Sequence, residues 1–420
     1  MKSRQAGLAF IFITLVLDVL GIGIVIPILP ELIATFRNGD LSAAARYYGW
    51  FVGMYAAMQF VFAPLLGNLS DRYGRRPVIL VALLGTGLDY LLLAAAPSLA
   101  WLFVGRVLAG ITGASITAAT AYIADISPPE RRAQNFGLIA AAFGVGFIIG
   151  PIIGGVLGTL GPRVPFYATA ALTLLNGLYG FFVLPESLPR AHRRPFVWRQ
   201  ANPLVALHAL GRSRVVLGLT GIVALATLAQ QALQSTFVLY TAYRFAWTAL
   251  DNGVALALYG TAAALIQAWL LRILLPRLGE RRALLLGLSS NVLGFVLYGL
   301  ATHGWMMYAI IVASSLGFLV QPVAQGIMSK QVGPDEQGAL QGALASLTSL
   351  MAVVGPILAT SLFSRFTSPT EVVALPGAPF FSGAALFFGG LLLTLATFRR
   401  TRATAPVVVR AEVVYDNKAA

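Results

Sequence analysis

The chain has 420 residues, of which 58% are hydrophobic and only 10% are charged, with a mean hydropathy of +0.81. Soluble domains carry roughly 25% charged residues, so this composition excludes an ordinary soluble protein. The net charge of +14 does not indicate a nucleic-acid partner, because the basic residues lie in short segments between apolar runs. Cysteine is absent, which excludes disulfides and thiolate metal sites, and the three histidines stand too far apart for us to expect a metal site.

Apolar windows of about 20 residues, the length that crosses a bilayer, predict twelve transmembrane helices. The first apolar run is too long for a cleaved signal peptide and is interpreted as the first span. The fold class expected is therefore an all-α membrane protein with spans at residues 8–34, 47–67, 77–96, 99–124, 134–160, 164–184, 214–242, 250–275, 282–301, 304–329, 338–364 and 377–398.

The distribution of basic residues predicts that both termini face the cytoplasm. With that orientation, one arginine lies within a span and five lie in outer loops, and the remaining Lys and Arg residues of the 29 lie in inner loops and tails. This asymmetry matches the positive-inside rule and supports that orientation. The outer arginines are Arg37, Arg46, Arg163, Arg244 and Arg365, and the arginine within a span is Arg106.

The longest and most basic connection, residues 185–213, divides the chain into a bundle at 1–184 and a second bundle at 214–398. The polar residues 399–420 are expected to form a disordered cytoplasmic tail. Glycines and a proline of the first bundle recur 205 residues later in the second, where Gly74, Gly137, Gly150 and Pro151 become Gly279, Gly342, Gly355 and Pro356. A duplicated six-span unit is typical of alternating-access carriers, which bind substrate between the halves.

The segment Gly67-Asn-Leu-Ser-Asp-Arg-Tyr-Gly-Arg-Arg-Pro77, between spans two and three, is predicted to be a gating turn. Gly67 permits close approach of a neighbouring helix, Asp71 suits a helix N-terminus, and Gly74 permits a tight turn. Arg75 or Arg76 is expected to pair with Asp125 at the inner end of span four. A plain positive-inside loop would explain the arginines but not Gly67, Asp71 and Gly74 together.

Span five places Gly146, Gly150 and Gly154 four residues apart, on one helical face where another backbone can pack closely. Pro151 removes a backbone hydrogen bond and kinks the helix. We expect Gly150 and Pro151 to take part in gating, with static packing as the alternative.

Ionisable groups inside the membrane are functional candidates, because burying each one is costly. Asp18 and Arg106 are each predicted to lie near mid-membrane, where they could meet, and Asp89 reaches a comparable depth and competes for Arg106. These three residues are the predicted proton-coupling group, with a static structural pair as the alternative. Uncharged polar side chains are candidates for substrate binding, or alternatively for helix packing: Gln59, Gln231, Gln234, Gln267, Asn291 and Gln325.

The chain resembles the major facilitator superfamily, and within it the bacterial tetracycline/proton antiporters. The likeness is carried by the 67–77 segment, Gly105-Arg-Val-Leu-Ala-Gly110 in span four, Gly146 to Gly155 in span five, and Leu17-Asp-Val-Leu-Gly-Ile-Gly23 in span one. The resemblance implies the major facilitator fold, a place in the bacterial inner membrane and proton-coupled drug export. Where those antiporters have a histidine in span eight and an aspartate in span nine, this chain has Ala263 and Asn291.

The leading hypothesis is a proton-driven antiporter that exports a small hydrophobic substrate, works as a monomer in the lipid bilayer and uses the proton gradient with no cofactor. Uptake of a small metabolite on the same fold is the alternative. An enzyme is not expected, because no aqueous segment carries a catalytic constellation, and a channel is a weaker possibility.

Overall fold

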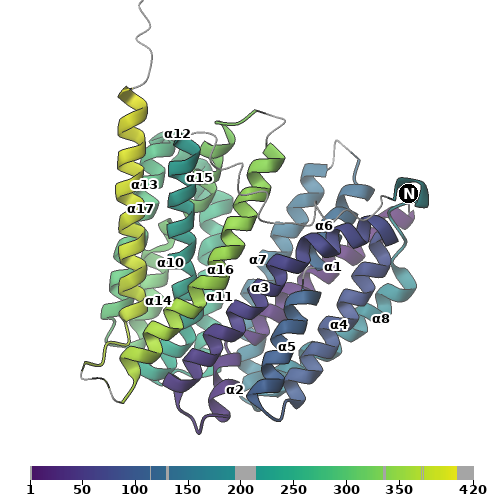
Figure 1. Cartoon of the computed structure of the whole chain (residues 1–420), viewed down its shortest axis with the longest axis horizontal. Helices are drawn as coiled ribbons and strands as arrows, with labels where there is room; N and C mark the ends of the chain where they lie inside the picture. Colours follow the sequence, from purple (N-terminus) through teal and green to yellow (C-terminus); the bar gives the residue numbers. More distant parts are fainter. Residues whose placement is uncertain are drawn as a thin grey trace, which may run out of the picture.

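The computed structural model describes residues 2–113, 115–128, 132–193, 214–333, 337–369, 371 and 373–403, and all regular structure within these ranges is helical. Helices long and apolar enough to cross a membrane number ten, or up to 12 if each of two bent pairs is one span. Figure 1 shows them as two bundles that lie side by side.

The first bundle is built from α1 to α8, and the second from α10 to α17. The bounds in the first bundle are α1 Lys2–Val25, α2 Leu29–Thr35, α3 Leu41–Tyr73, α4 Arg75–Ala95, α5 Leu99–Thr112, α6 Ser115–Ile126, α7 Arg132–Gly158 and α8 Val164–Val183. A short 3-10 helix, η2 Arg190–His192, follows.

In the second bundle they are α10 Arg214–Phe245, α11 Ala249–Leu265, the π-helix η5 Ile266–Leu270, α12 Leu271–Leu278, α13 Glu280–Leu300, α14 Gly304–Ala313, the 3-10 helix η6 Ser315–Leu319, α15 Val320–Ser329, α16 Gln337–Thr367 and α17 Ala378–Ala403.

The predicted spans are confirmed as helical segments, but two of them are broken. Span one bends by 44° between α1 and α2, at a break that contains Pro27, and Pro30 stands in the first turn of α2. Span ten bends by 42° between α14 and the η6–α15 segment. Proline lacks an amide hydrogen and cannot continue the hydrogen-bond ladder, which accounts for the first break. The last helix runs to Ala403, five residues past the predicted boundary, and residues 404–420 of the predicted tail lie outside the described residues.

The internal repeat is visible in backbone geometry and in side-chain pairing. Gly74 (φ 107°, ψ 158°) and Gly279 (φ 75°, ψ 160°) both precede a helix in a conformation that L side chains rarely adopt. Beside the first turn, Arg75 Nε lies 3.0 Å from Asp125 Oδ2. Beside the second, Lys330 Nζ lies 2.7 Å from Glu280 Oε1. Positions 280 and 330 lie 205 residues after 75 and 125, so the repeat keeps an ion pair with its charges reversed.

The two ends of the molecule differ in how the bundles meet. We call the end that carries the Gly74 and Gly279 turns the basic end, and the other the opposite end. At the opposite end, Ser42 Oγ of α3 donates to the carbonyl of Ser364 in α16 at 2.8 Å. Nearby, a Cβ on Gly49 would lie 2.9 Å from the Pro356 carbonyl oxygen, and one on Gly155 of α7 would lie 2.8 Å from that of Ala249 in α11. The halves therefore pack backbone to backbone there.

Contact between the halves is looser toward the basic end. A Cβ on Gly137 or Gly144 of α7, or on Gly342 of α16, would meet nothing within 4 Å. Figure 1 shows the ends of α16 and of α6–α7 standing apart at this end of the molecule. The bundles thus touch at the opposite end and diverge at the basic end.

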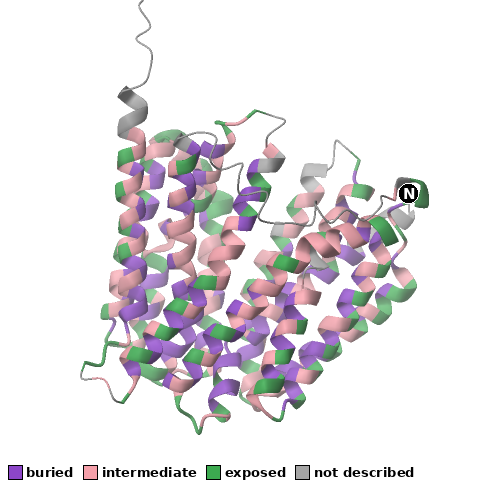
Figure 2. Cartoon of the chain, in the orientation of Figure 1, coloured by how far each residue is buried: buried purple, intermediate pink, exposed green. Residues whose placement is uncertain are grey.

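Large apolar side chains are exposed on the outward faces of the helices, as a membrane protein requires. Figure 2 shows exposed residues along the outer helix surfaces, including many on α4 and α8. Trp50, Trp101 and Trp305 are at least half exposed. Trp101 and Trp305 lie within two residues of the start of a helix and Trp50 lies in the first third of α3, all toward the opposite end, where tryptophan anchors are expected.

Candidate functional site

A cavity of about 970 Å³ lies between the bundles. Its walls come from α1, α2, α3, α4, α5 and α7 of the first half, and from α10, α11 and η5 of the second. Its charged lining residues, Asp18, Asp89 and Arg106, all belong to the first half. A mostly apolar cavity with a few convergent polar groups is the usual form of a small-molecule site.

An ion pair lies on the first-half wall of this cavity. Arg106 Nη2 of α5 lies 3.2 Å from Asp89 Oδ2 of α4, and the two side chains are 10% and 1% exposed. A Cβ on Gly105 would lie 2.9 Å from Asp89 Oδ1, so the glycine before Arg106 permits this approach. The Arg106 guanidinium also lies 5.9 Å from the ring centre of Tyr55.

The pair is not fully satisfied. Asp89 Oδ1 and Arg106 Nε are buried without a hydrogen-bond partner in the described part of the chain. A buried polar group that lacks a partner is costly, so these two atoms can accept a hydrogen bond from, or donate one to, a ligand, a proton carrier or water in the cavity. Asp18 of α1 lines the same cavity, so the structure brings the three predicted proton-coupling residues to one wall. In the structure, Arg106 forms its ion pair with Asp89.

The predicted substrate-binding residues divide into two groups. Gln231 and Gln234 of α10 and Gln267 of η5 line the cavity. Gln59 donates to the Tyr55 hydroxyl at 2.9 Å and so stands behind a lining residue.

Asn291 and Gln325 are not among the residues that line this cavity. The Asn291 amide donates to the carbonyl of Gly317 at 3.3 Å, within η6, so it supports the break in span ten. Gln325 belongs to α15, none of whose residues lines the cavity. Helical periodicity alone does not say which face of a uniformly apolar span points inward, so the sequence could not separate these two residues from those that line the cavity.

Several lining residues were not singled out by the sequence as site residues. Tyr48 and Tyr55 of α3, Tyr90 of α4 and Ser235 of α10 belong to this group. Tyr259 of α11 also lines the cavity and accepts a hydrogen bond from Gln230. Ala263, at the position of the span-eight histidine of the resembled antiporters, lines the cavity as well. The second-half wall is therefore polar but uncharged among the described residues.

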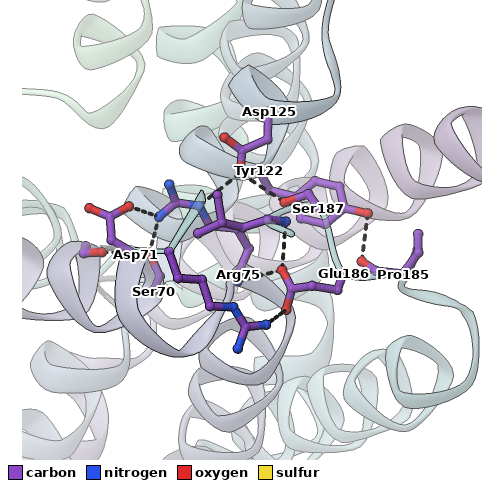
Figure 3. Close-up of polar contacts among 11 residues, drawn as sticks. Ser70, Asp71, Arg75, Tyr122, Asp125, Pro185, Glu186 and Ser187 are labelled. Carbon is purple, nitrogen blue, oxygen red and sulfur yellow. Dashed lines mark hydrogen bonds and ion pairs between the residues drawn. The ribbon is translucent and has the colours of Figure 1, made fainter. Parts of the chain in front are cut away.

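The turn around Gly74 forms a second site, at the basic end (Figure 3). Arg75 is its centre: Nη1 lies 2.6 Å from Asp71 Oδ1 and donates to Ser70 Oγ at 2.6 Å, and Nε donates to Asp125 at 3.0 Å. The arginine side chain is only 9% exposed. One guanidinium thus ties α3, α4 and α6 together, and the predicted Arg75–Asp125 pair is confirmed.

Glu186, which the sequence did not single out, completes this turn. Its Oε1 accepts the Arg75 amide at 2.9 Å and the Leu188 amide at 3.0 Å, and Oε2 lies 3.7 Å from Arg193 (Figure 3). Gly74 provides no side-chain cap to α4, so a carboxylate from beyond α8 satisfies that N-terminus instead. A Cβ on Gly74 would collide with Glu186. No pattern in the sequence indicated this contact, because Glu186 follows α8 and lies far along the chain from Gly74.

Two contacts in the turn around Gly74 differ from those predicted. Arg76 donates to the carbonyl of Phe181 in α8 at 2.6 Å rather than to Asp125. Asp71 pairs with Arg75 rather than with a helix N-terminus. A Cβ on Gly67 would lie 3.4 Å from Thr117, an ordinary contact distance, so that packing is not unusually close.

The glycine face of α7 packs on α1. A Cβ on Gly150 would lie 2.9 Å from Gly23 Cα, and one on Gly146 would lie 2.8 Å from the Leu20 amide nitrogen. The carbonyl of Pro151, on the same helix, approaches Gly253 of α11. The helix that carries Gly150 and Pro151 is thus in close backbone contact with its own half and with the other.

Comparisons with known proteins agree with one another. The model of the Major Facilitator Superfamily matches residues 11–356 and, again, 273–413. The chain is 40% identical over 400 residues to the class C tetracycline resistance protein of Escherichia coli, covering 95% of this chain and 98% of that protein. It is 37% identical over 403 residues to the class G tetracycline resistance protein of Vibrio anguillarum, covering 93% and 97%.

Among solved structures, the human organic anion transporter MFSD10 superposes with a TM-score of 0.67 at 25% identity, covering 93% of this chain and 99% of that one. The nucleoside transporter NupG superposes with a TM-score of 0.76 at 13% identity, covering 95% and 100%. The second likeness concerns the fold alone.

Proposed function

The chain belongs to the Major Facilitator Superfamily and, within it, to the family of the tetracycline resistance proteins; from that premise we propose that it exports tetracycline-like drugs in exchange for protons. It is a membrane transporter with the major facilitator fold. Export, rather than uptake, is supported by relatives whose names describe resistance to a drug.

The observation that carries the proposal is the buried Asp89–Arg106 pair on the wall of the cavity. A carboxylate held there in apolar surroundings is tolerated because of its counter-charge. Protonation of Asp89 removes that counter-charge, and the Arg106 guanidinium then needs another acceptor. A proton and a drug can therefore compete for the same wall, which is what an antiporter requires.

The basic end is assigned to the cytoplasm, because alternate loops gather the lysines and arginines there. With that assignment, halves that touch at the opposite end and diverge at the basic end describe a carrier whose cavity faces the cytoplasm. Drug would enter in this state. Rocking of the halves about the α3–α16 and α7–α11 contacts would then turn the cavity outward.

The gating turn would control this motion. Arg75, held by Asp71, Asp125 and Glu186, keeps α3, α4 and α6 together as one body. The first half can then rotate as a rigid unit against the second. The protein would act as a monomer in the inner membrane, since one chain supplies both walls of the cavity.

The test uses purified protein in liposomes with an imposed proton gradient. Protons move down this gradient in one direction and should drive tetracycline in the opposite direction. We expect gradient-driven transport that Asp89→Asn abolishes, while gradient-independent exchange of labelled for unlabelled drug continues. Glu371→Gln is the matched control, because that acid pairs with Arg365 on the surface, at 3.2 Å, away from the cavity. Full gradient-driven transport by Asp89→Asn would show that coupling lies elsewhere.

A further inference from the structure

The span formed by α11, η5 and α12 is a thin wall of the cavity. From Ala264 to Trp269, every residue is exposed except Ile266, which is buried. Among the unbroken spans described, this one has the smallest buried share, 17% of its apolar window. At this level the span is therefore accessible on most of its circumference, whereas nearer the opposite end α11 packs closely on α7.

The exposed residues of this wall face in two directions. Ala264, Gln267 and Ala268 line the cavity. Leu265 and Trp269, 59% and 64% exposed, are not lining residues and lie on the outer surface. In a membrane that outer surface meets lipid, so a single helix separates lipid from the cavity here.

The neighbouring helix on this side is α7, and its contact with α11 ends partway along. A Cβ on Gly260 of α11 would lie 3.3 Å from the Phe147 carbonyl oxygen. One turn further toward the basic end, a Cβ on Gly144 would meet nothing within 4 Å, although Gly144 lines the cavity. Phe147 also lines the cavity and is 36% exposed. We call the boundary between α7 and α11 from Phe147 and Gly260 to Gly144 the α7–α11 seam.

The π-helix lies beside the seam. Its five residues, Ile266–Leu270, replace the regular hydrogen-bond ladder of the span at the level of Gln267. Such π-segments weaken the local ladder and are frequent at functional sites. The wall therefore combines exposure on two faces and an irregular backbone at the same place.

We propose that the drug enters the cavity from the bilayer, between the helices, through the α7–α11 seam. The inference rests on the proposed function, because it takes the substrate to be hydrophobic. The route suits an amphiphile whose apolar body partitions into the leaflet at the basic end. Its polar group would meet the Gln267 amide first, with Phe143 and Phe147 facing its apolar body.

The natural absence of cysteine allows a direct test with single-cysteine variants. Gly144→Cys places a thiol in the seam, and Ala109→Cys places one on the α5 wall of the same cavity. The protein is reconstituted with a phospholipid that carries a maleimide at the end of an acyl chain. Because thiol modification depends on access, we expect the lipid-borne reagent to label Gly144→Cys at least about ten times faster than Ala109→Cys.

Labelling needs no transport, so this result stands apart from the fate of the proposed function. Ala268→Cys, on the other side of the seam, replaces Gly144→Cys if that variant does not fold. The proposal is overturned if a charged, water-soluble methanethiosulfonate labels the seam thiol while the lipid-borne maleimide does not.

A transport measurement adds a matched pair of variants. Gly144→Trp fills the seam, and Gly342→Trp adds the same bulk on α16, which supplies no lining residue and where an added Cβ also meets open space. Because a blocked entry slows capture, we expect Gly144→Trp to raise the KM for tetracycline at least about fivefold. Gly342→Trp is expected to leave it unchanged, and equal effects of the two would refute lateral entry.

Discussion

Arg106 and Asp89 meet at 3.2 Å on the cavity wall, yet each keeps one buried polar atom without a partner in the described part of the chain. Such a pair is held by charge more than by complete hydrogen bonding. A partly satisfied buried network is also a place where a third group, a proton or a polar atom of a ligand, can alter the balance.

Removing one member of this pair should harm stability more than removing both. Arg106→Gln leaves the Asp89 carboxylate buried without a counter-charge, and we expect a loss of about 3–5 kcal/mol. The double variant Asp89→Asn/Arg106→Gln should recover most of that loss but remain uncoupled from protons. Thermal unfolding in detergent and gradient-driven efflux measure the two properties. Recovery of coupling in the double variant would contradict the proposed mechanism.

Gly150 should tolerate no larger side chain, because α1 leaves no room for it. A Cβ there would lie 2.8 Å from the Leu20 carbonyl oxygen and 2.9 Å from Gly23 Cα. We expect Gly150→Val to destabilise the protein by about 1–3 kcal/mol, the usual cost of overpacking. Gly144→Ala, where an added Cβ meets open space, is the control and should unfold at an unchanged temperature. Similar unfolding temperatures for both variants would show that the α1–α7 contact is looser than described.

Gln267 and Gln325 should differ in their effect on drug binding, since only Gln267 lines the cavity. Loss of one hydrogen bond costs about 0.5–1.5 kcal/mol, so Gln267→Ala should raise the Kd for tetracycline by about three- to tenfold. Gln325→Ala should leave the Kd unchanged. Titration of the purified variants by tryptophan fluorescence gives both values, and a weaker affinity in Gln325→Ala alone would reverse the assignment.

The two repeat-related ion pairs should contribute very differently to stability. The Arg75 side chain is 9% exposed and holds several partners, whereas Lys330 is 69% exposed and Glu280 is 32% exposed. We expect Arg75→Gln to cost about 3 kcal/mol, as for a buried charge pair. Glu280→Gln should cost about 1 kcal/mol or less, as for a surface pair. Comparable shifts in unfolding temperature would mean that exposure does not determine how much each ion pair contributes to stability.

The sequence predicted the spans, the duplication, the Arg75–Asp125 pair and the meeting of Asp18, Asp89 and Arg106 at one depth. These features depend on hydropathy, on turn glycines and on the cost of charge in lipid, all of which are local or compositional. The breaks in spans one and ten were not predicted, although Pro27 and Gly317 stand at or near them. Proline within membrane helices is often tolerated, and its presence alone does not fix a bend.

What the sequence could not supply was the inward face of each apolar span. Asn291 and Gln325 look like site residues in a list of intramembrane polar groups, but the first holds the Gly317 carbonyl and the second belongs to a helix outside the lining. Glu186 was missed for a related reason. Its role comes from the meeting of the end of α8 with the start of α4, which are 111 residues apart at the Glu186–Arg75 contact.

The opposed polarity of Arg75–Asp125 and Glu280–Lys330 limits how the duplicated halves could have diverged. Changing a single member from acid to base would have set two like charges against each other at the same corner of the fold. In at least one half, one of the two positions must therefore have held an uncharged residue before the reversed pair of charges was established. For the same reason, a chimaera that transplants the 70–77 turn of one half into the other would bring an arginine against Lys330, and it would need the opposing helix to be transplanted as well.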